Sequence, residues 1–314
     1  MPSRIETLDI SADELVEHAR ERGIDPFGTN GGPYTWVEPL GDARAGDIAF
    51  CRFEDDAGLK ALRASKAGAV FVPNSLAGSL PSDKALYLPC DHPRLELLRM
   101  LQSFWRELNW TFDPAANPSI QDDAKIADDV RIGPFTVIGP GVSIGSGTRV
   151  GSNCHIERAE IGRDCIIGNN TSIGQYGFGY EDDPITGETL QFPHIGGVAI
   201  HDRVEIGSNT CIDRGSIGNT IIGDDCKIDN LIHVAHNVKM GKRCKVIALA
   251  IIGGSVELGD DAWIAPAAAI RDWCNVGSSA IVGLGAVVTK HVADGETVVG
   301  NPARAIERTK HRYK

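Results

Sequence analysis

An aliphatic residue recurs at every sixth position from Ile222 to Val288. All twelve positions hold isoleucine, valine, leucine or methionine. A period of six fits neither an amphipathic helix, with its period of about 3.6, nor a strand that alternates over its whole length. Self-similarity at a short fixed period is typical of solenoid proteins. The chain is therefore predicted to contain a mainly β solenoid.

The residue four positions after each aliphatic one is also restricted, to cysteine, alanine, valine or isoleucine. Because side chains alternate across a strand, both positions can point into one interior. The unit is then one six-residue side of a prism. Three sides make a coil of roughly eighteen residues, as in a parallel β-helix.

Charge and hydrophobicity argue against several classes of protein. The formal net charge of -11 argues against a general nucleic-acid binder, which needs a broad basic face. The N-terminus lacks a charged segment followed by an apolar one, and the apolar run at residues 246–252 is far too short to span a bilayer. We therefore expect a cytoplasmic protein without a membrane span.

The chain has eight cysteines, and none has a partner in a Cys-x-x-Cys motif. Five occupy the small inward position of the repeat, where a thiol behaves as a small hydrophobe: Cys154, Cys165, Cys226, Cys244 and Cys274. We expect neither disulfides nor a metal site from these five, and the sequence leaves Cys51, Cys90 and Cys211 undetermined.

Residues 1–115 lack the repeat and are predicted to form a small α/β domain. Ser11 and Glu14 make a capping box ahead of a first helix. The other expected elements are helices at residues 58–65 and 92–108 and strands at residues 47–51 and 69–73. A linker at residues 114–118 leads into the solenoid, which is predicted to span residues 116–300 and to be followed by a short segment, residues 301–314, with room for about two helical turns.

The repeat begins at Ile120, shortens to five-residue steps at Ile161 and Ile217, and is left altogether between residues 175 and 197. This excursion is rich in glycine, aromatic and acidic residues. We expect a loop of about twenty residues without secondary structure of its own, and such loops are usually functional.

A polar cluster follows the excursion, at residues 229–237. Alternation places Ile232 and Val234 inside the prism. Five polar residues then lie at outward or corner positions: Asp229, Asn230, His233, His236 and Asn237. They are either a functional site on a rigid solenoid or solvated loop residues, and the repeat alone does not decide between the two.

Several motifs around this cluster resemble the UDP-3-O-acylglucosamine N-acyltransferases of lipid A synthesis. They are Phe-Pro-His-Ile-Gly at residues 192–196, the run from Val204 to Gly215, and Ile-Asp-Asn-Leu-Ile-His-Val-Ala-His-Asn-Val at residues 228–238. Gly-Phe-Gly-Tyr at residues 177–180 and two N-terminal stretches, residues 46–50 and 67–72, are also similar to that family. The likeness covers nearly the whole chain except its C-terminus.

The resemblance implies a left-handed β-helix, preceded by a domain of the nucleotide-binding type. It also implies a homotrimer with active sites between subunits. The reaction would move an acyl group from a phosphopantetheine thioester, on acyl carrier protein or coenzyme A, to the amine of a UDP-linked amino sugar. No bound cofactor is expected.

His236 matches the family's general base in its Ala-His-Asn motif, and Asp229 matches the aspartate that would hold and polarise the imidazole. A neutral imidazole can take the proton of an amine as the C–N bond forms. Because one coil is about eighteen residues, Gly254 should stack on His236. Its N–H is a candidate oxyanion donor, as in the family, unless the glycine serves only the turn.

The remaining candidate residues are less constrained. Asn230 and Asn237 are expected to bind substrate, and His233 would either contact substrate or face solvent. The aromatic residues of the excursion, Phe178, Tyr180 and Phe192, would either line the sugar or acyl pocket or pin the loop to the prism. His194, which follows them, is a further candidate for substrate binding. Four cations would either meet donor phosphates or form a solvated face: Lys239, Lys242, Arg243 and Lys245.

The sequence departs from the family in three places. The stretch around Ile270 lacks a further histidine, and only Phe53, out of register, stands near the expected uracil-binding aromatic. The end of the chain, residues 298–304, resembles coenzyme A dependent hexapeptide acetyltransferases instead. An acetyl-coenzyme A dependent N-acetyltransferase acting on another nucleotide-linked amino sugar is therefore the alternative. A zinc carbonic anhydrase on the same prism, or a sugar-nucleotide binder without catalysis, is a remote one.

Overall fold

The computed structural model describes residues 8–29, 31–104 and 117–306. Contacts divide the chain into two compact units, Met1–Thr111 and Phe112–Lys314. Most of the expected linker and the end of the expected helix at residues 92–108 lie outside the described residues, as does the segment after residue 306. None of the described helices is both long and apolar enough to cross a membrane.

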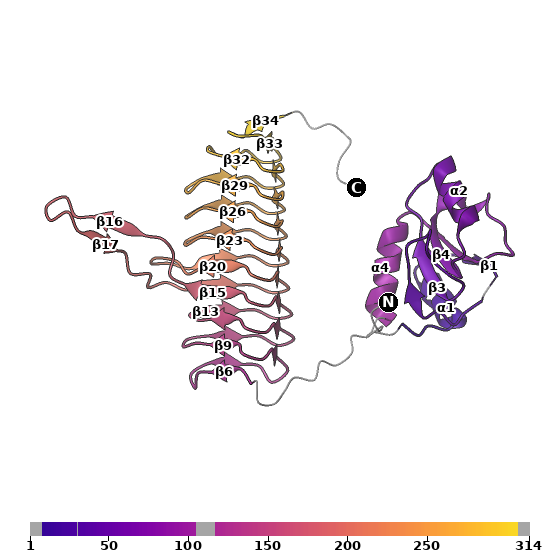
Figure 1. The fold of residues 1–314 in the computed structure, drawn as a ribbon, viewed down its shortest axis with the longest axis horizontal. Helices are drawn as coiled ribbons and strands as arrows, with labels where there is room; N and C mark the ends of the chain where they lie inside the picture. The colour runs from indigo at the N-terminus through magenta and orange to yellow at the C-terminus, as the bar shows by residue number, and fades with distance from the viewer. Residues whose placement is uncertain (1–7, 30, 105–116, 307–314) are drawn as a thin grey trace. The chain divides into compact units, whose positions relative to one another are not determined.

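The N-terminal unit is a five-stranded sheet with helices, as predicted for an α/β domain (Figure 1). The strand order is β1-β5-β4-β3-β2, and only β1 is antiparallel to its neighbour. Its elements are α1 (Ala12–Glu21), β1 (Phe27–Gly28), β2 (Trp36–Val37), β3 (Asp47–Phe50), α2 (Asp56–Ala64), β4 (Ala69–Pro73), α3 (Asn74–Ala77), β5 (Leu86–Cys90) and α4 (Pro93–Phe104).

The predicted capping box is present at the start of α1. Glu14 N–H donates to Ser11 Oγ at 3.2 Å, and Ser11 N–H donates to the Glu14 carboxylate at 2.9 Å. Two backbone donors at the start of the helix, the N–H groups of Ser11 and Glu14, are thereby satisfied.

The second unit is a prism of three parallel sheets that the chain visits in turn (Figure 1). The first face holds β6 (Ser119–Ile120), β9 (Val137–Ile138), β12 (His155–Ile156), β15 (Ser172–Gln175), β20 (Cys211–Asp213), β23 (His233–Val234), β26 (Ile251–Ile252), β29 (Ala269–Ile270) and β32 (Val287–Val288). The second face holds β7 (Lys125–Ile126), β10 (Ser143–Ile144), β13 (Ala159–Ile161), β18 (Val198–Ile200), β21 (Thr220–Ile222), β24 (Lys239–Met240), β27 (Glu257–Leu258) and β30 (Asn275–Val276).

The third face holds β8 (Arg131–Ile132), β11 (Arg149–Val150), β14 (Ile166–Ile167), β19 (Glu205–Ile206), β22 (Lys227–Ile228), β25 (Lys245–Val246), β28 (Trp263–Ile264), β31 (Ile281–Val282), β33 (Thr297–Val299) and the antiparallel β34 (Arg304–Ala305). We call the turn from the first to the second face the first corner, the next turn the second corner, and the turn back to the first face the third corner.

Strand register confirms the predicted eighteen-residue coil. His233 pairs with Ile251 and Val234 with Ile252, so equivalent residues stack in successive coils. The corners owe their shape to a residue with positive φ, which recurs every sixth position from Asp225 to Ser279. Left-handed backbone at one residue per corner turns the chain sharply without breaking the strand register.

The aliphatic residues of the repeat fill the interior, where Val234, Ile252 and Ile270 are buried. Burial of each such side chain stabilises the fold by about 1.5–3 kcal/mol. The five inward cysteines are buried free thiols, as predicted. Of the undetermined three, Cys51 and Cys90 are buried in the N-terminal unit, and Cys211 is exposed on the first face.

The excursion differs from the expectation of an unstructured loop. It contains an antiparallel hairpin, β16 (Tyr180–Asp182) and β17 (Thr189–Gln191), which protrudes from the prism (Figure 1). The turn between the strands is held by Asp183, whose carboxylate accepts from Ile185 N–H at 2.7 Å and from Thr186 N–H at 3.2 Å. The excursion leaves β15 and returns at β18, so it departs from the first corner.

Candidate active site

His236 lies at the first corner, between β23 and β24, and Gly254 occupies the next coil of the same corner. A Cβ added to Gly254 would lie 2.9 Å from His236 Cε1 and 3.0 Å from His236 Nε2. The predicted stacking of glycine on histidine is therefore present. Among the described residues, Gly254 N–H donates no hydrogen bond within the chain, so a donor is free beside the imidazole.

Asn237 fixes the orientation of the His236 ring. Its Oδ1 accepts a hydrogen bond from Ser216 N–H at 2.8 Å, which turns its Nδ2 toward the imidazole. Asn237 Nδ2 lies 3.1 Å from His236 Nδ1 and 2.8 Å from Ser216 Oγ. Because Nδ1 accepts from the amide, the neutral ring of His236 carries its hydrogen on Nε2 in this conformation.

The excursion returns to the first corner and packs over His236. His194 is 2% exposed, and its ring stands nearly perpendicular to that of His236, with centroids 5.2 Å apart. Gly177 lies against both rings, because a Cβ there would be 2.8 Å from His236 Cδ2 and 3.1 Å from His194 Nε2. Only glycine leaves room for this contact.

His194 is almost fully buried beside His236, and its predicted contact with substrate stays a prediction. Its Nδ1 lies 2.9 Å from the carbonyl oxygen of Phe192, which makes Nδ1 the protonated nitrogen. Its Nε2 is buried and has no hydrogen-bond partner. Buried in this way, His194 acts on His236 through packing and charge.

The pKa of His236 is lowered. Burial is the main cause, the charge that His194 would carry adds to it, and a hydrogen bond to the Phe178 carbonyl opposes it. A lowered pKa keeps the imidazole neutral at physiological pH, which is the form a general base needs.

Arg214 anchors the excursion, a role that our sequence analysis missed. Its buried guanidinium donates to the His194 carbonyl at 2.9 Å and to Glu157 Oε1 at 2.9 Å. It also lies 4.0 Å from the ring centroid of Tyr176. One feature of the sequence could have indicated this role: Arg214 stands at a corner of the prism, in the tripeptide Asp-Arg-Gly at residues 213–215.

Asp213 and His233 form a second group of titratable side chains on the first face. His233 is exposed, and its Nε2 lies 3.7 Å from Asp213 Oδ2. Burial raises the pKa of Asp213 to about 6, although His233 and His194 act to lower it. Sequence analysis singled out His233 but not Asp213.

Asp229 and Asn230 lie at the third corner, one side of the prism away from His236. Asp229 Oδ1 accepts from Asn230 N–H at 2.7 Å, and its Oδ2 accepts from Ala248 N–H at 3.2 Å. The expected support of His236 by Asp229 is thus not formed within one chain. The polar cluster expected at residues 229–237 is divided between two corners.

The expected phosphate-binding cations are mostly neutralised. Lys239 pairs with Glu257 at 3.1 Å, and Lys242 pairs with Asp224 at 3.1 Å. Arg243 lies at the second corner and makes a bidentate contact with Asp261. These three contacts fit a solvated charged face. Lys245 instead lies on the third face, with its Nζ 5.3 Å from the Trp263 ring centroid.

The aromatic residues of the excursion remain open to solvent. Phe178 is 84% exposed and contacts Tyr180, with ring centroids 5.0 Å apart. Phe192 is partly exposed, and its ring lies 6.4 Å from that of His194. Phe53, in the N-terminal unit, is exposed beneath the Arg52 guanidinium. The structure leaves all four rings accessible to a ligand.

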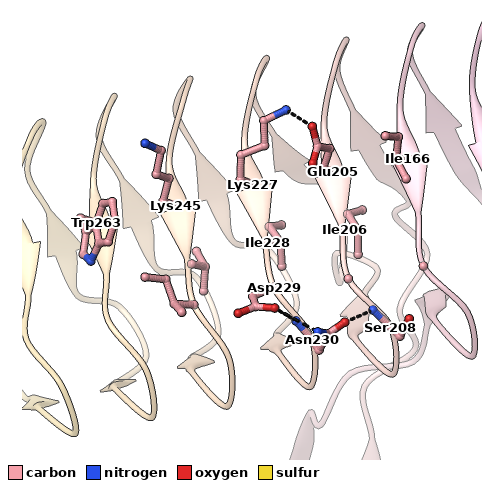
Figure 2. Close-up of a pocket in the computed structure, with 14 residues that line it drawn as sticks. Ile166, Glu205, Ile206, Ser208, Lys227, Ile228, Asp229, Asn230, Lys245 and Trp263 are labelled. Carbon is pink, nitrogen blue, oxygen red and sulfur yellow. Dashed lines mark hydrogen bonds and ion pairs between the residues drawn. The ribbon is translucent and has the colours of Figure 1, made fainter. Parts of the chain in front are cut away.

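A shallow groove of about 500 Å³ runs along the third face. Figure 2 shows Glu205, Lys227, Lys245 and Trp263 standing along it, and the Asp229–Asn230–Ser208 hydrogen bonds close one edge. The groove does not include His236. In the parts of the chain that are described, no three His, Cys, Asp or Glu side chains are grouped to hold a metal.

Comparison with known proteins finds similarity within the solenoid to hexapeptide-repeat transferases. Residues 123–158 match the family described as bacterial transferase hexapeptide (six repeats). The chain is 42% identical over 156 residues to the UDP-3-O-acylglucosamine N-acyltransferase of Caulobacter sp. (strain K31), which covers 50% of this chain and 45% of the relative. A probable mitochondrial UDP-3-O-acylglucosamine N-acyltransferase of Arabidopsis thaliana is 41% identical over 151 residues, 48% of this chain and 49% of the relative. The chain thus spans about half the length of the curated relatives it matches.

Solved structures show the same fold. LpxA from Acinetobacter baumannii matches with a TM-score of 0.54 and 27% identity over 60% of this chain and 71% of that one. LpxA from Bacteroides fragilis, a UDP-N-acetylglucosamine acyltransferase, matches with a TM-score of 0.54 and 25% identity over 62% of this chain and 74% of that one. The predicted fold class, a left-handed parallel β-helix, is confirmed.

Proposed function

We propose that this chain, which is related through its solenoid to the UDP-3-O-acylglucosamine N-acyltransferases, transfers an acyl group from a phosphopantetheine thioester to the amine of a UDP-linked amino sugar. The observation that carries the proposal is the pairing of His236 with Gly254 at the first corner. A neutral imidazole and an unused backbone N–H stand there side by side, which is what acyl transfer requires of a protein.

The reaction proceeds by attack of the sugar amine on the thioester carbonyl. As the C–N bond forms, His236 Nε2 takes one proton from the nitrogen, and the carbonyl oxygen becomes an oxyanion that accepts from Gly254 N–H. When the intermediate collapses, the C–S bond breaks and His236 returns its proton to the sulfur. The products are an amide and a free thiol.

The tautomer of His236 adds a condition to this mechanism. A lone pair on Nε2 requires the ring hydrogen to be on Nδ1, where Asn237 Nδ2 now donates. Rotation of the Asn237 amide would bring Oδ1 to Nδ1–H. Ser216 Oγ can follow as a donor, but Ser216 N–H loses its acceptor. We therefore place this rotation after substrate binding, which would supply the free energy for it.

The active form is a homotrimer with sites shared between protomers. Support comes from a difference in side-chain polarity between the corners. Leu231, Leu249 and Leu284 are exposed along the third corner, whereas charged pairs line the second. An exposed apolar strip of this kind is typical of an interface. In such an assembly Asp229 of one protomer can approach His236 of another, and a native mass of three chains is the expected measurement.

The assay that tests the function combines purified protein with two donors, a hydroxyacyl carrier protein and acetyl-coenzyme A, and a panel of UDP-linked amino sugars. The proposal predicts an N-acylated sugar nucleotide with at least one donor. Preference for the carrier protein identifies the lipid A reaction, and preference for acetyl-coenzyme A identifies the N-acetyltransferase alternative. Absence of an amide product with every pair contradicts the proposal.

A further inference from the structure

Asp213 is a buried carboxylate that the fold does not use. It ends β20 at the entrance to the first corner and is 8% exposed. Its carboxylate lies beside His233, whose Nε2 is 3.7 Å from Oδ2, too far for a hydrogen bond. Among the described residues, no hydrogen bond to either carboxylate oxygen is present.

Such an arrangement costs free energy, since a buried carboxylate is normally compensated by donors. Other acids of the prism have donors even though they are more exposed than Asp213. Glu157 accepts from Arg214 at 2.9 Å, and Asp225 and Asp261 make bidentate contacts with Arg203 and Arg243. Uncompensated carboxylates are found more often at functional sites.

The adjacent Arg214 does not explain Asp213. All of its hydrogen bonds go elsewhere, to the carbonyl oxygens of His194 and Gly174 and to Glu157. The guanidinium is turned into the base of the excursion, away from the carboxylate that precedes it in the chain. Within the described ranges, Asp213 therefore has no hydrogen-bond donor that would account for its burial.

Asp213 lies at the proposed active site. Ile212 pairs with Val234 in the parallel ladder, so Asp213 is followed across the coils by Ala235, the residue before His236. The side chain of Ala235 is a single methyl group. His194 and His233 both act electrostatically on Asp213 and on His236, which places all four groups around one region.

We propose that Asp213 recognises the amine of the acceptor sugar, accepting hydrogen bonds from its nitrogen and presenting it to His236. This inference rests on the proposed N-acyltransferase function and adds the residue that selects an amine over a hydroxyl. An ammonium or amine supplies the donors that the carboxylate lacks, and a charge-assisted bond of this kind is strong. A hydroxyl in the same position offers one donor and no charge.

Asp213 also accepts a proton in the proposed reaction. An ammonium must lose one proton before it can attack and another during attack. The first passes from nitrogen to the Asp213 carboxylate, leaving a neutral amine and a carboxylic acid. The second passes to His236 as the C–N bond forms and then to the departing sulfur. Asp213 releases its proton to water when the product leaves. Because the pKa of Asp213 is raised, proton transfer from the ammonium to Asp213 is more favourable than transfer to a carboxylate of ordinary pKa.

Calorimetric binding of UDP-glucosamine and UDP-glucose, at about pH 7.5, tests the inference. The two probes differ only in the amine and the hydroxyl at one carbon. We expect the wild-type protein to prefer UDP-glucosamine by on the order of tenfold or more. Asp213→Asn should lose this preference while its affinity for UDP-glucose stays within about twofold. The matched control is Asp225→Asn at the second corner, which should keep the wild-type preference.

A wild-type protein without the preference, or an Asp213→Asn protein that keeps it, overturns the role of Asp213. Should Asp213→Asn fail to fold, the wild-type preference is measured at about pH 5 as well. It should shrink there, since the Asp213 carboxylate becomes protonated and loses the charge that would hold an ammonium. A preference that is unchanged at the lower pH contradicts the inference. If the wild-type protein binds neither probe but acylates another amino sugar, the proposed function stands and only the choice of acceptor is wrong. The preference for an amine is then measured with that sugar and its hydroxyl analogue.

Discussion

Gly254 lies so close to His236 that a single methyl group would stand 3.0 Å from Nε2 of the imidazole. Gly254→Ala should therefore displace the ring and obstruct the N–H that we assign to the oxyanion. We expect kcat to fall on the order of a hundredfold, with little change in Tm because Gly254 is not among the positive-φ residues. Gly78→Ala, where nothing lies within 4 Å of the added carbon, is the control. Full activity in Gly254→Ala would exclude the oxyanion role.

Asn237 determines which nitrogen of His236 carries the hydrogen. Imidazole nitrogen chemical shifts at a pH where the ring is neutral should report hydrogen on Nε2 in the ligand-free wild type. Asn237→Asp replaces the amide donor with an acceptor and should move the hydrogen to Nδ1. The left-handed φ of this residue tolerates aspartate. The same tautomer in both proteins would show that Asn237 does not control the ring.

Arg214 should be the residue of the first corner on which stability depends most. Arg214→Ala removes the buried guanidinium that binds Glu157 and the His194 carbonyl, so we expect a loss of about 3 kcal/mol in the free energy of unfolding. Arg203→Ala removes an exposed pair with Asp225 and should cost less than about 1 kcal/mol. Denaturant unfolding measures both, and equal losses would contradict the anchoring role.

The acidic limb of the rate profile should reflect the lowered pKa of His236. Since the neutral ring is the active form, kcat/KM should hold as pH falls toward about 6.5, the ordinary histidine value, and decline only below it. His194→Phe keeps a buried ring but removes the neighbouring charge, so the pKa of His236 should rise and the limb should move to higher pH. A limb that moves to lower pH in this variant would contradict the assigned cause.

The repeat predicted the parts of the site that depend only on coil geometry. An aliphatic residue at every sixth position determines which side chains point inward, and an eighteen-residue coil brings Gly254 onto His236. The same geometry separates Asp229 from His236 within one chain. Residues 229 and 236 are seven apart, more than one side of the prism, so they belong to successive corners. The support of His236 by Asp229 that the resemblance implies therefore stays a prediction that requires a second protomer.

The contacts around the excursion were beyond a repeat-based prediction. His194, Gly177 and Tyr176 lie in a segment that leaves the periodic register, and their approach to the first corner depends on the hairpin that β16 and β17 form. Asp213 was missed for a different reason. Its position after an inward isoleucine looks like that of any corner residue, and only coordinates show that its carboxylate is buried without a donor.

The most direct test of the account is the turnover of His236→Gln compared with its binding of sugar nucleotide. Glutamine keeps a side chain of polar character at the first corner but cannot take a proton from the amine. We predict that kcat for amide formation falls at least about a hundredfold, while the affinity for the acceptor stays within about threefold of the wild type. Turnover at a rate near that of the wild type would contradict the assignment of His236 as the base.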